Sequence, residues 1–232
     1  INVRLSGQAL DETLAAIGDA GASYGHVRSS DQSEVLFEYA NPNTHKEIHI
    51  GHLRNFITGV AYYGLWKAAG VNVQAVQFVN DQGVNVAKTL WMMVRKFWSE
   101  TLPIEEFNDV ESGKVQRKIH EEMGSFFGGR EIGEFYVEAT ETLEVKGDTA
   151  RAEVSYVQAR LEAGDPAWKA LWLATRKKCL TEIQNICREI GIAFDRAEPY
   201  LESAFLDEAS AIVSRLESTN IAKKSDGALI ID

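Results

Sequence analysis

Two histidines lie in the run His49-Ile50-Gly51-His52, shortly after the cation Lys46. Imidazole N–H groups and a lysine ammonium can all donate hydrogen bonds to a phosphate. If a helix begins at this run, its unpaired backbone N–H groups and its positive dipole end favour an anion further. Gly51 lets a flat base approach the backbone, because glycine has no Cβ. The run therefore predicts a nucleotide site at a helix start.

The flanking sequence predicts the elements that would position this site. Residues 35–40 are a short β-prone run, and it ends before Pro42, which cannot donate to a sheet ladder. Apolar residues recur at helical spacing over residues 51–68. A second, largely buried strand is expected within residues 71–79, followed by a helix over residues 84–98. The order strand, helix, strand, helix implies parallel pairing of the two strands.

Parallel pairing brings two loops to one edge of the predicted sheet. In such sheets, ligands bind at the carboxyl ends of the strands. The loop with His49 and His52 follows the first strand, and the loop with Asn80 and Asp81 follows the second. We therefore expect these four side chains to lie at one site. The simpler interpretation is that the histidines are exposed loop residues and that Gly51 is an ordinary turn.

The stretch from Glu38 to Arg54 closely resembles the first signature of arginyl-tRNA synthetases, which are class I aminoacyl-tRNA synthetases. The resemblance extends to further segments, which are Ile1-Asn2-Val3-Arg4-Leu5, Val79-Asn80-Asp81-Gln82-Gly83, Ile190-Gly191-Ile192-Ala193-Phe194-Asp195, Glu202-Ser203 and Asp226-Gly227-Ala228-Leu229. It is strongest over residues 38–83 and looser over about residues 98–172. The fold it implies is α/β: the first half of a Rossmann-like (HIGH-superfamily) nucleotide-binding fold with a large, mainly helical insertion.

The resemblance also implies three parts in the chain. Residues 1–32 would be the tail of an N-terminal region and a linker, residues 33–98 the first half of the catalytic fold, and residues 99–232 a connective insertion. Amphipathic patterns predict helices in the third part at residues 113–123, 156–163, 168–190 and 206–216. The glycine-rich run at residues 124–129 lacks the lysine and the serine or threonine of a phosphate loop, so it is interpreted as an ordinary loop.

The resemblance implies that the protein activates arginine. The carboxylate of arginine attacks the α-phosphorus of ATP, which enters with Mg²⁺, and the aminoacyl-adenylate then esterifies tRNA(Arg). His49 and His52 would hold the phosphates as charge builds, with Gly51 beside them at the nucleotide. Lys46 would supply phosphate charge in place of a degenerate later Lys-Met-Ser-Lys-Ser signature. The simpler interpretation of Lys46 is a solvated loop cation.

Glu38 is the candidate for the arginine side chain. On an alternating strand it shares a face with Leu36 and Ala40, so we expect a buried carboxylate among apolar neighbours. A guanidinium pairs bidentately with a carboxylate, which makes it the best partner. The resemblance assigns Glu38 to the guanidinium and Asn43 to the polar backbone end of arginine. On an edge strand, Glu38 would face water instead.

Three further residues complete the predicted substrate set. Asn41 lies between Glu38 and Asn43 and is included with them as a substrate-binding candidate. Asn80 and Asp81 have a similar claim on the amino acid or on the ribose. Turn chemistry alone also favours asparagine and aspartate at such positions.

Length, charge and composition limit the function. The chain has 232 residues, much shorter than an entire arginyl-tRNA synthetase, so we expect an inactive piece of a larger, monomeric parent. The net charge of −10 excludes a general basic surface, so any tRNA contact must be local, at residues 176–178 or 223–224. The simpler interpretation of these short basic runs is a solvated face. No apolar stretch approaches the ~20 residues of a membrane span, and we expect a cytoplasmic protein. Cys179 and Cys187 are expected to be reduced packing residues.

Three alternative functions stay open at this point. His45, His49 and His52 with Glu47 could hold a metal for hydrolysis, although no His-Glu-x-x-His pattern is present and no tightly bound metal is expected. A small nucleotidyltransferase would share the His-Ile-Gly-His motif, but such compact enzymes lack a long insertion. A non-catalytic synthetase-like binding module is the third alternative, and the extent of the full-length gene product discriminates it from an enzyme.

Overall fold

The structure is a computed structural model, and it describes residues 4–26, 33–124, 127–219, 221–225 and 228–231. The α-helices of these residues are α1 (Gly7–Ala20), α2 (Ile50–Ala68), α3 (Val84–Phe97), α4 (Asp109–Met123), α5 (Gly129–Lys146), α6 (Asp148–Glu162), α7 (Pro166–Glu189) and α8 (Leu206–Ser218). The strands are β1 (Glu34–Glu38), β2 (Asn72–Val76), β3 (Phe78–Val79), β4 (Tyr200–Leu201), β5 (Ala222–Ser225) and β6 (Ala228–Ile231). Short 3-10 turns are η1 (Gly21–Ser23), η2 (Ile104–Glu106) and η4 (Glu202–Phe205).

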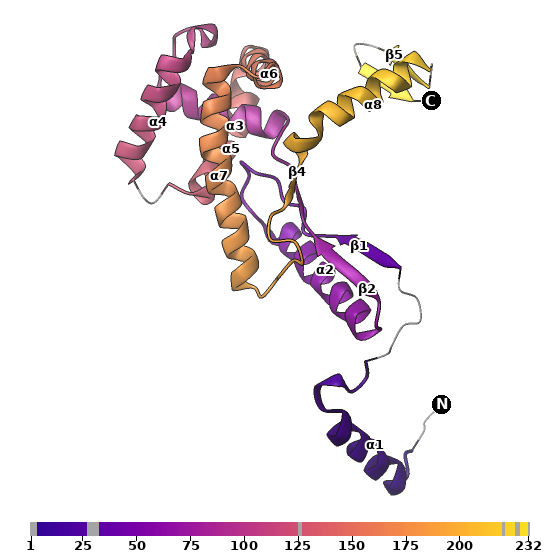
Figure 1. Ribbon diagram of the computed structural model, residues 1–232. Coiled ribbons are helices and arrows are strands. Elements are labelled where there is room, and N and C mark those ends of the chain that lie inside the picture. The colour runs from indigo at the N-terminus through magenta and orange to yellow at the C-terminus, as the bar shows by residue number, and fades with distance from the viewer. Residues whose placement is uncertain (1–3, 27–32, 125–126, 220, 226–227, 232) are drawn as a thin grey trace.

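The strand and helix order predicted around the histidine motif is present. Strand β1 pairs parallel with β2, with Val35 opposite Val73, and α2 runs between them in the chain and lies against them (Figure 1). Parallel pairing continues between β3 and β4, where Phe78 lies opposite Tyr200. Strands β5 and β6 form an antiparallel pair near the carboxyl terminus. The chain therefore combines short parallel strand pairs with longer helices.

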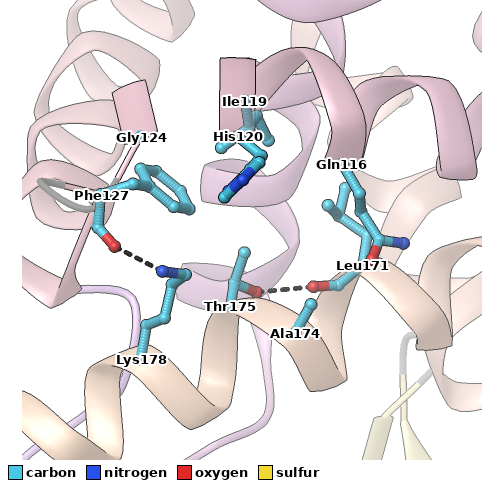
Figure 2. Close-up of a pocket in the computed structure, with 9 residues that line it drawn as sticks. All are labelled: Gln116, Ile119, His120, Gly124, Phe127, Leu171, Ala174, Thr175 and Lys178. Carbon is cyan, nitrogen blue, oxygen red and sulfur yellow. Dashed lines mark hydrogen bonds between the residues drawn. The ribbon is translucent and has the colours of Figure 1, made fainter. Parts of the chain in front are cut away.

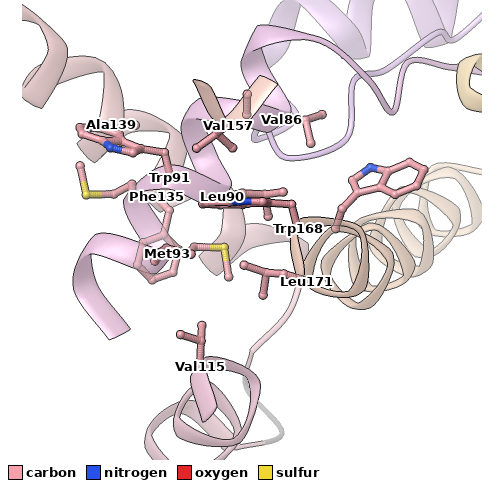
Figure 3. Close-up of a cluster of buried hydrophobic side chains, with 14 of the residues drawn as sticks. Val86, Leu90, Trp91, Met93, Val115, Phe135, Ala139, Val157, Trp168 and Leu171 are labelled. Carbon is pink, nitrogen blue, oxygen red and sulfur yellow. The ribbon is translucent and has the colours of Figure 1, made fainter. Parts of the chain in front are cut away.

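A helical cluster makes the larger of two hydrophobic cores. Helix α3 lies at its centre and packs against α5 and α6, and α7 and α4 complete the cluster. Figure 3 shows Leu90, Met93 and Leu171 of this core, with Trp91 and Trp168 beside them. Because the other helices cover most of α3, even its polar residues Lys88, Thr89 and Arg95 are buried.

A smaller core joins the strands to the end of α7. Phe56 of α2, Ala75 of β2 and Val79 of β3 are fully buried there. The second half of α7 contributes Ile183 and Cys187 to the same core, while its first half belongs to the helical cluster. Helix α7 therefore spans both cores and connects the strand region to the helices.

Helix boundaries follow local capping. Helix α4 begins at Asp109, earlier than the predicted 113, because the Asn108 side chain accepts from the N–H groups of Val110 and Glu111. Gly147, with φ 62°, ends α5 and starts α6 directly, so the helix predicted at 156–163 begins at Asp148. Helices α5 and α1 were not predicted from the sequence. Their glycines and scattered polar residues weaken the apolar periodicity.

Helix α1 has no buried residue and lies apart from the other helices (Figure 1). Helix α8 also has no buried residue, and it extends away from the strand region with β5 and β6. None of the helices in the described ranges combines the length and the apolar character that crossing a membrane requires.

Candidate functional site

The two motif histidines close the amino-terminal end of α2. His49 is the N-cap residue, and its Nδ1 accepts from the Gly51 N–H at 3.1 Å. The Nδ1 of His52 accepts from the His49 N–H at 3.2 Å, so the two side chains form a reciprocal capping box. Their rings lie 4.1 Å apart between centroids. The motif therefore caps the helix through its own imidazoles.

This capping assigns the tautomer of each neutral ring. Because both Nδ1 atoms accept hydrogen bonds from the backbone, the proton of each neutral imidazole lies on Nε2. Burial lowers the pKa of His52, and the charges of His49 and Lys46 act in the same direction. The N–H groups at Nε2 of His49 and His52 are thus the donors that this helix start can offer to a ligand.

Gly51 has a second reason to be glycine. A Cβ at this position would lie 2.9 Å from Cε1 and 3.0 Å from Nδ1 of His49. The capping ring occupies the space that a side chain would need. The capping position of the His49 ring thus favours glycine here, independently of any base that approaches the backbone.

Lys46 lies beside the histidines and against helix α5. Its Nζ is 5.6 Å from the centroid of the Tyr136 ring, and the Nζ of Lys88 lies over the same ring at 3.7 Å. Helix α5 approaches this loop closely, because a Cβ on Gly133 would lie 2.9 Å from the backbone nitrogen of Glu47. Lys46 is half-buried. It is therefore a packed loop cation next to His52, not one that is fully surrounded by solvent.

His45 is fully buried, and all its polar groups contact neighbours. Its Nδ1 lies 3.0 Å from Thr44 Oγ1, and its Nε2 lies 2.8 Å from Thr175 Oγ1. Its backbone N–H donates to Cys179 Sγ at 3.4 Å, and its carbonyl accepts from Thr89 Oγ1 at 3.1 Å. His45 thus ties the loop to α3 and α7.

The environment of His45 argues against a metal ligand. Burial lowers its pKa to about 3, with the charge of Arg176 acting in the same direction, so the ring is neutral. Both ring nitrogens contact threonine hydroxyls, which leaves neither for a metal. Within the described ranges, no group of three or more histidine, cysteine, aspartate or glutamate residues is arranged to hold a metal ion.

The two predicted loops meet at Asn43 and Asn80, which form a parallel bridge between the chain segments. The Thr44 N–H donates to the Asn80 carbonyl at 2.9 Å, and the Asn80 N–H donates to the Pro42 carbonyl at 3.2 Å. Asn43, Asn80 and the histidine motif therefore share one edge of the strand region, as expected for the carboxyl ends of parallel strands.

Asp81 has an internal role. Its carboxylate is fully buried and pairs with Arg176 at 2.8 Å. It also accepts from the N–H of Ser203 at 2.8 Å and from its hydroxyl at 2.7 Å. With these partners in place, the Asp81 side chain is not available to a substrate. Turn chemistry alone does not explain it, because its partners come from distant parts of the chain.

The expected burial of Glu38 is wrong for the described chain. Glu38 is exposed, and Leu36 on the same face is 62% exposed, because no described element covers this face of β1. The carboxylate has one local partner, the amide of Asn41, whose Nδ2 donates to Oε1 at 2.5 Å. The Asn41 Oδ1 accepts from the Phe78 N–H at 3.3 Å. Asn41 thus holds Glu38 to the start of β3.

Residues of α7 that were not predicted from the sequence support the loops. Thr175 and Arg176 contact His45 and Asp81, yet 176–178 reads in sequence only as a basic cluster that could touch RNA. Arg176 is instead committed to an internal ion pair. No local signal could have found these contacts, because Arg176 and Asp81 are 95 residues apart. Cys179 and Cys187 are both free and buried, as predicted.

A cavity of about 200 Å³ lies elsewhere, between α4 and α7. Figure 2 shows His120 and Ile119 on one side and Lys178 and Thr175 on the other. None of the predicted site residues lines it. The candidate site is therefore the open edge formed by the two loops, and this cavity is separate from it.

Comparison with known proteins agrees with this arrangement of motif, strands and helices. A family model described as "tRNA synthetases class I (R), catalytic domain" matches residues 14–232. The arginine–tRNA ligase of Borrelia duttonii is 26% identical over 96% of this chain and 35% of its own length. The arginine–tRNA ligase of Clostridioides difficile is 28% identical over 97% of this chain and 35% of its own length.

The structural comparison supports the fold. The arginyl-tRNA synthetase of Plasmodium falciparum superposes with a TM-score of 0.57 over 87% of this chain and 30% of that protein, at 18% identity. The chain spans about a third of the length of the curated relatives it matches. Because the family model covers nearly all of its residues, the chain belongs to the class I tRNA synthetases, in the catalytic-domain family of the arginine enzymes.

Proposed function

We propose that this chain forms the first half of the active site of an arginine–tRNA ligase. The observation that carries the proposal is the capping arrangement at the start of α2, which leaves the Nε2–H groups of His49 and His52 free for a ligand. Membership of the arginine family supplies the substrate class. In the full protein, these donors and Lys46 would bind the phosphates of ATP.

The chemistry of the phosphate side follows from these groups. Attack of the arginine carboxylate on the α-phosphorus builds negative charge on the phosphate oxygens and on the departing pyrophosphate. Donors fixed before the reaction stabilise that charge without reorganising, and losing one of them typically costs about 10²–10³ in rate. His49 and His52 fit this role because the helix N-terminus already orients both rings. ATP would enter as its Mg²⁺ complex, the metal being part of the substrate.

The arginine side is proposed at Glu38, Asn43 and Asn80. A guanidinium would pair with the exposed Glu38 carboxylate, which Asn41 already orients. Asn43 and Asn80 lie together at the bridge and could receive the ammonium or carboxylate end of arginine, or the ribose. The exposed face around Leu36 would be covered by the part of the protein that completes the arginine pocket.

We propose the His-Ile-Gly-His run as the motif of the HIGH superfamily on a Rossmann-like half, with residues 1–32, 33–98 and 99–232 as N-terminal tail, catalytic half and insertion. The substrates would be arginine, ATP and tRNA(Arg), and the parent enzyme would be a cytoplasmic monomer. The present chain alone would be inactive, because it matches only a third of its relatives.

Arginine-dependent exchange between ATP and pyrophosphate, measured with tRNA present on the full-length gene product, tests the proposal. His49→Ala or His52→Ala should lower kcat by about 10²–10³ with little change in the KM for arginine, because donors that tighten on the transition state affect rate. His120→Ala, an exposed histidine on α4, is the matched control. Absence of arginine-dependent exchange in the unsubstituted protein would favour a non-catalytic synthetase-like module.

Lys46 allows charge and position to be separated in the same assay. Lys46→Met should raise the KM for ATP and slow adenylate formation, because it removes the cation beside His52. Lys46→Arg should retain part of the activity, since the charge survives while the compact ammonium geometry does not. Unchanged ATP kinetics in the methionine variant would limit Lys46 to packing against Tyr136.

A further inference from the structure

Two consecutive residues of helix α7 contact the two loops of the candidate site. Thr175 Oγ1 lies 2.8 Å from Nε2 of His45, which directly precedes Lys46. Arg176 pairs at 2.8 Å with Asp81, which directly follows Asn80. Helix α7 lies in the part of the chain that the sequence assigns to the insertion. One turn of an inserted helix thus contacts both sides of the site.

The Thr175 contact is directional. Its hydroxyl hydrogen points to the carbonyls of Leu171 and Trp172, at 2.8 and 3.0 Å, and Figure 2 shows the first of these bonds. The Thr175 oxygen is therefore left to accept from the Nε2–H of the neutral His45 ring. His45 and Thr175 are almost fully buried, so water cannot replace this bond. Thr175 fixes the ring and, through it, the backbone that leads into Lys46.

The second contact fixes the other loop at both side chain and backbone. Arg176 bonds the buried Asp81 carboxylate, and the Trp172 Nε1–H donates to the Asp81 carbonyl at 2.9 Å. Trp172 also stacks against the Arg176 guanidinium, 4.3 Å from ring centroid to Cζ. Residues from one turn of α7 therefore determine where Asn80 lies.

The two loops are also joined directly through the Asn43–Asn80 bridge. Contacts from α7 to both loops and between the loops close a ring, so a shift of α7 would displace Lys46 and Asn80 together. A misplacement of about 1 Å by a residue remote from the chemistry can cost about 10² in rate. The geometry of this turn of α7 is thus coupled to the reaction.

We propose that Thr175 and Arg176 are positioning residues of the adenylation reaction, which hold Lys46 and Asn80 in place through His45 and Asp81. The inference rests on the proposed function and deepens it. It gives the helical insertion a defined part in arginine activation. Neither residue touches a substrate, so their effect must pass through the loops.

Thr175→Val in the full-length protein is the primary test. Valine keeps the shape and removes the acceptor of the His45 N–H, so kcat for arginine-dependent exchange should fall about 10- to 100-fold while the KM for arginine changes little. Thr175→Ser restores the hydroxyl and should retain most of the rate. Thr181→Val is the control, because Thr181 lies exposed on the same helix and bonds only the Lys177 carbonyl.

A double-mutant cycle separates positioning from general destabilisation. If Thr175 acts through Lys46, Thr175→Val should have little further effect on kcat in a Lys46→Met background. Equal fold-losses in both backgrounds would mean that Thr175 only stabilises the fold, and they would overturn the inference for Thr175.

Arg176→Lys is the second test, because it keeps a charge beside Asp81 but loses the planar guanidinium that packs against Trp172. It should lower kcat, whereas Arg188→Lys, on the same helix and bonded only to Asn185, should not. Wild-type rates in both Thr175→Val and Arg176→Lys would remove this inference alone. Absence of exchange in the unsubstituted protein would remove the proposed function, and the inference with it.

Discussion

The loop that carries Lys46 and the strand face that carries Glu38 differ in how many contacts they make with the rest of the described chain. Each polar group of His45 in the loop has a partner: Thr44 contacts Nδ1 from within the loop, and the other three partners come from α3 and α7. Glu38 has one local amide partner, on a face where Leu36 is mostly exposed. Helices α3, α5 and α7 support the candidate phosphate side within this chain. On the candidate arginine side, no described element covers the face of β1 that carries Glu38 and Leu36.

The largest effect on stability is expected at the buried ion pair between Arg176 and Asp81. Arg176→Met would leave the Asp81 carboxylate buried without its cation, so the free energy of unfolding should fall by about 3 kcal/mol. Denaturant unfolding of the full-length protein measures this loss. Arg188→Met, on the exposed end of α7, is the control and should change stability little. A loss as small as that of the control would mean that Asp81 is solvated.

The second largest effect on stability is expected at low pH, through the buried His45 of the Lys46 loop. The pKa of His45 is about 3 in the fold against 6.5 in the unfolded chain, so below pH 6.5 the unfolded state binds a proton that the folded state does not. Its contribution is intact above pH 6.5 and falls by about 1.4 kcal/mol per pH unit down to about pH 3. Between pH 7 and pH 4.5, the free energy of unfolding should therefore fall by about 2–3 kcal/mol less in His45→Asn than in the parent protein.

Asparagine is a suitable replacement for this pH test because His45 has φ 57°, a conformation that asparagine tolerates. The lowered pKa of His52 acts with the same sign and stays present in the variant. An identical pH dependence in the parent and in His45→Asn would show that the buried ring does not resist protonation.

Substitution of Tyr39, the residue after Glu38, should have a smaller effect on the free energy of unfolding, and one of opposite sign. Its hydroxyl is buried and has no hydrogen-bond partner among the described residues, and burial raises its pKa to about 12. Tyr39→Phe removes this unsatisfied group and should stabilise the protein by about 1 kcal/mol in denaturant unfolding. Destabilisation by the same substitution would indicate that the hydroxyl has a partner in the full-length protein.

The smallest effect on stability is expected at Glu38 itself. Glu38→Gln should change the free energy of unfolding by no more than about 0.5 kcal/mol, because the side chain is exposed. Its effect should appear instead as a raised KM for arginine, since the amide cannot pair with a guanidinium as a carboxylate does. Arginine kinetics unchanged by this substitution would remove Glu38 from the proposed pocket.

Local signals in the sequence predicted the elements around the motif well. Residues 51–68 and 84–98 have strong helical periodicity, and helices α2 and α3 lie within a residue of those bounds. Helix α5 was missed because Gly129 and Gly133 interrupt its pattern. The Gly133 site accommodates the close approach of the Lys46 loop, a tertiary reason that the helix's own sequence does not reveal.

The candidate site was predictable where neighbours in sequence act together and not where distant residues pair. The run from His49 to His52 is local, so its place at the start of α2 was predicted, although the capping of the helix by the two imidazoles was not. The role of Asp81 depends on Arg176 and Ser203, which lie 95 and 122 positions away. Burial of Glu38 was wrong because alternation along a strand shows which residues share a face but not whether anything covers that face.

Nitrogen NMR of the histidine side chains in the full-length protein tests the central claim most directly. A preformed phosphate side requires the proton of each neutral His49 and His52 ring to lie on Nε2 before any ligand is present. Addition of ATP with Mg²⁺ should shift both Nε2 resonances without changing the tautomer, while the exposed His120 stays unchanged. Protonation at Nδ1 in the free protein, or no response of either ring to ATP, would contradict the account.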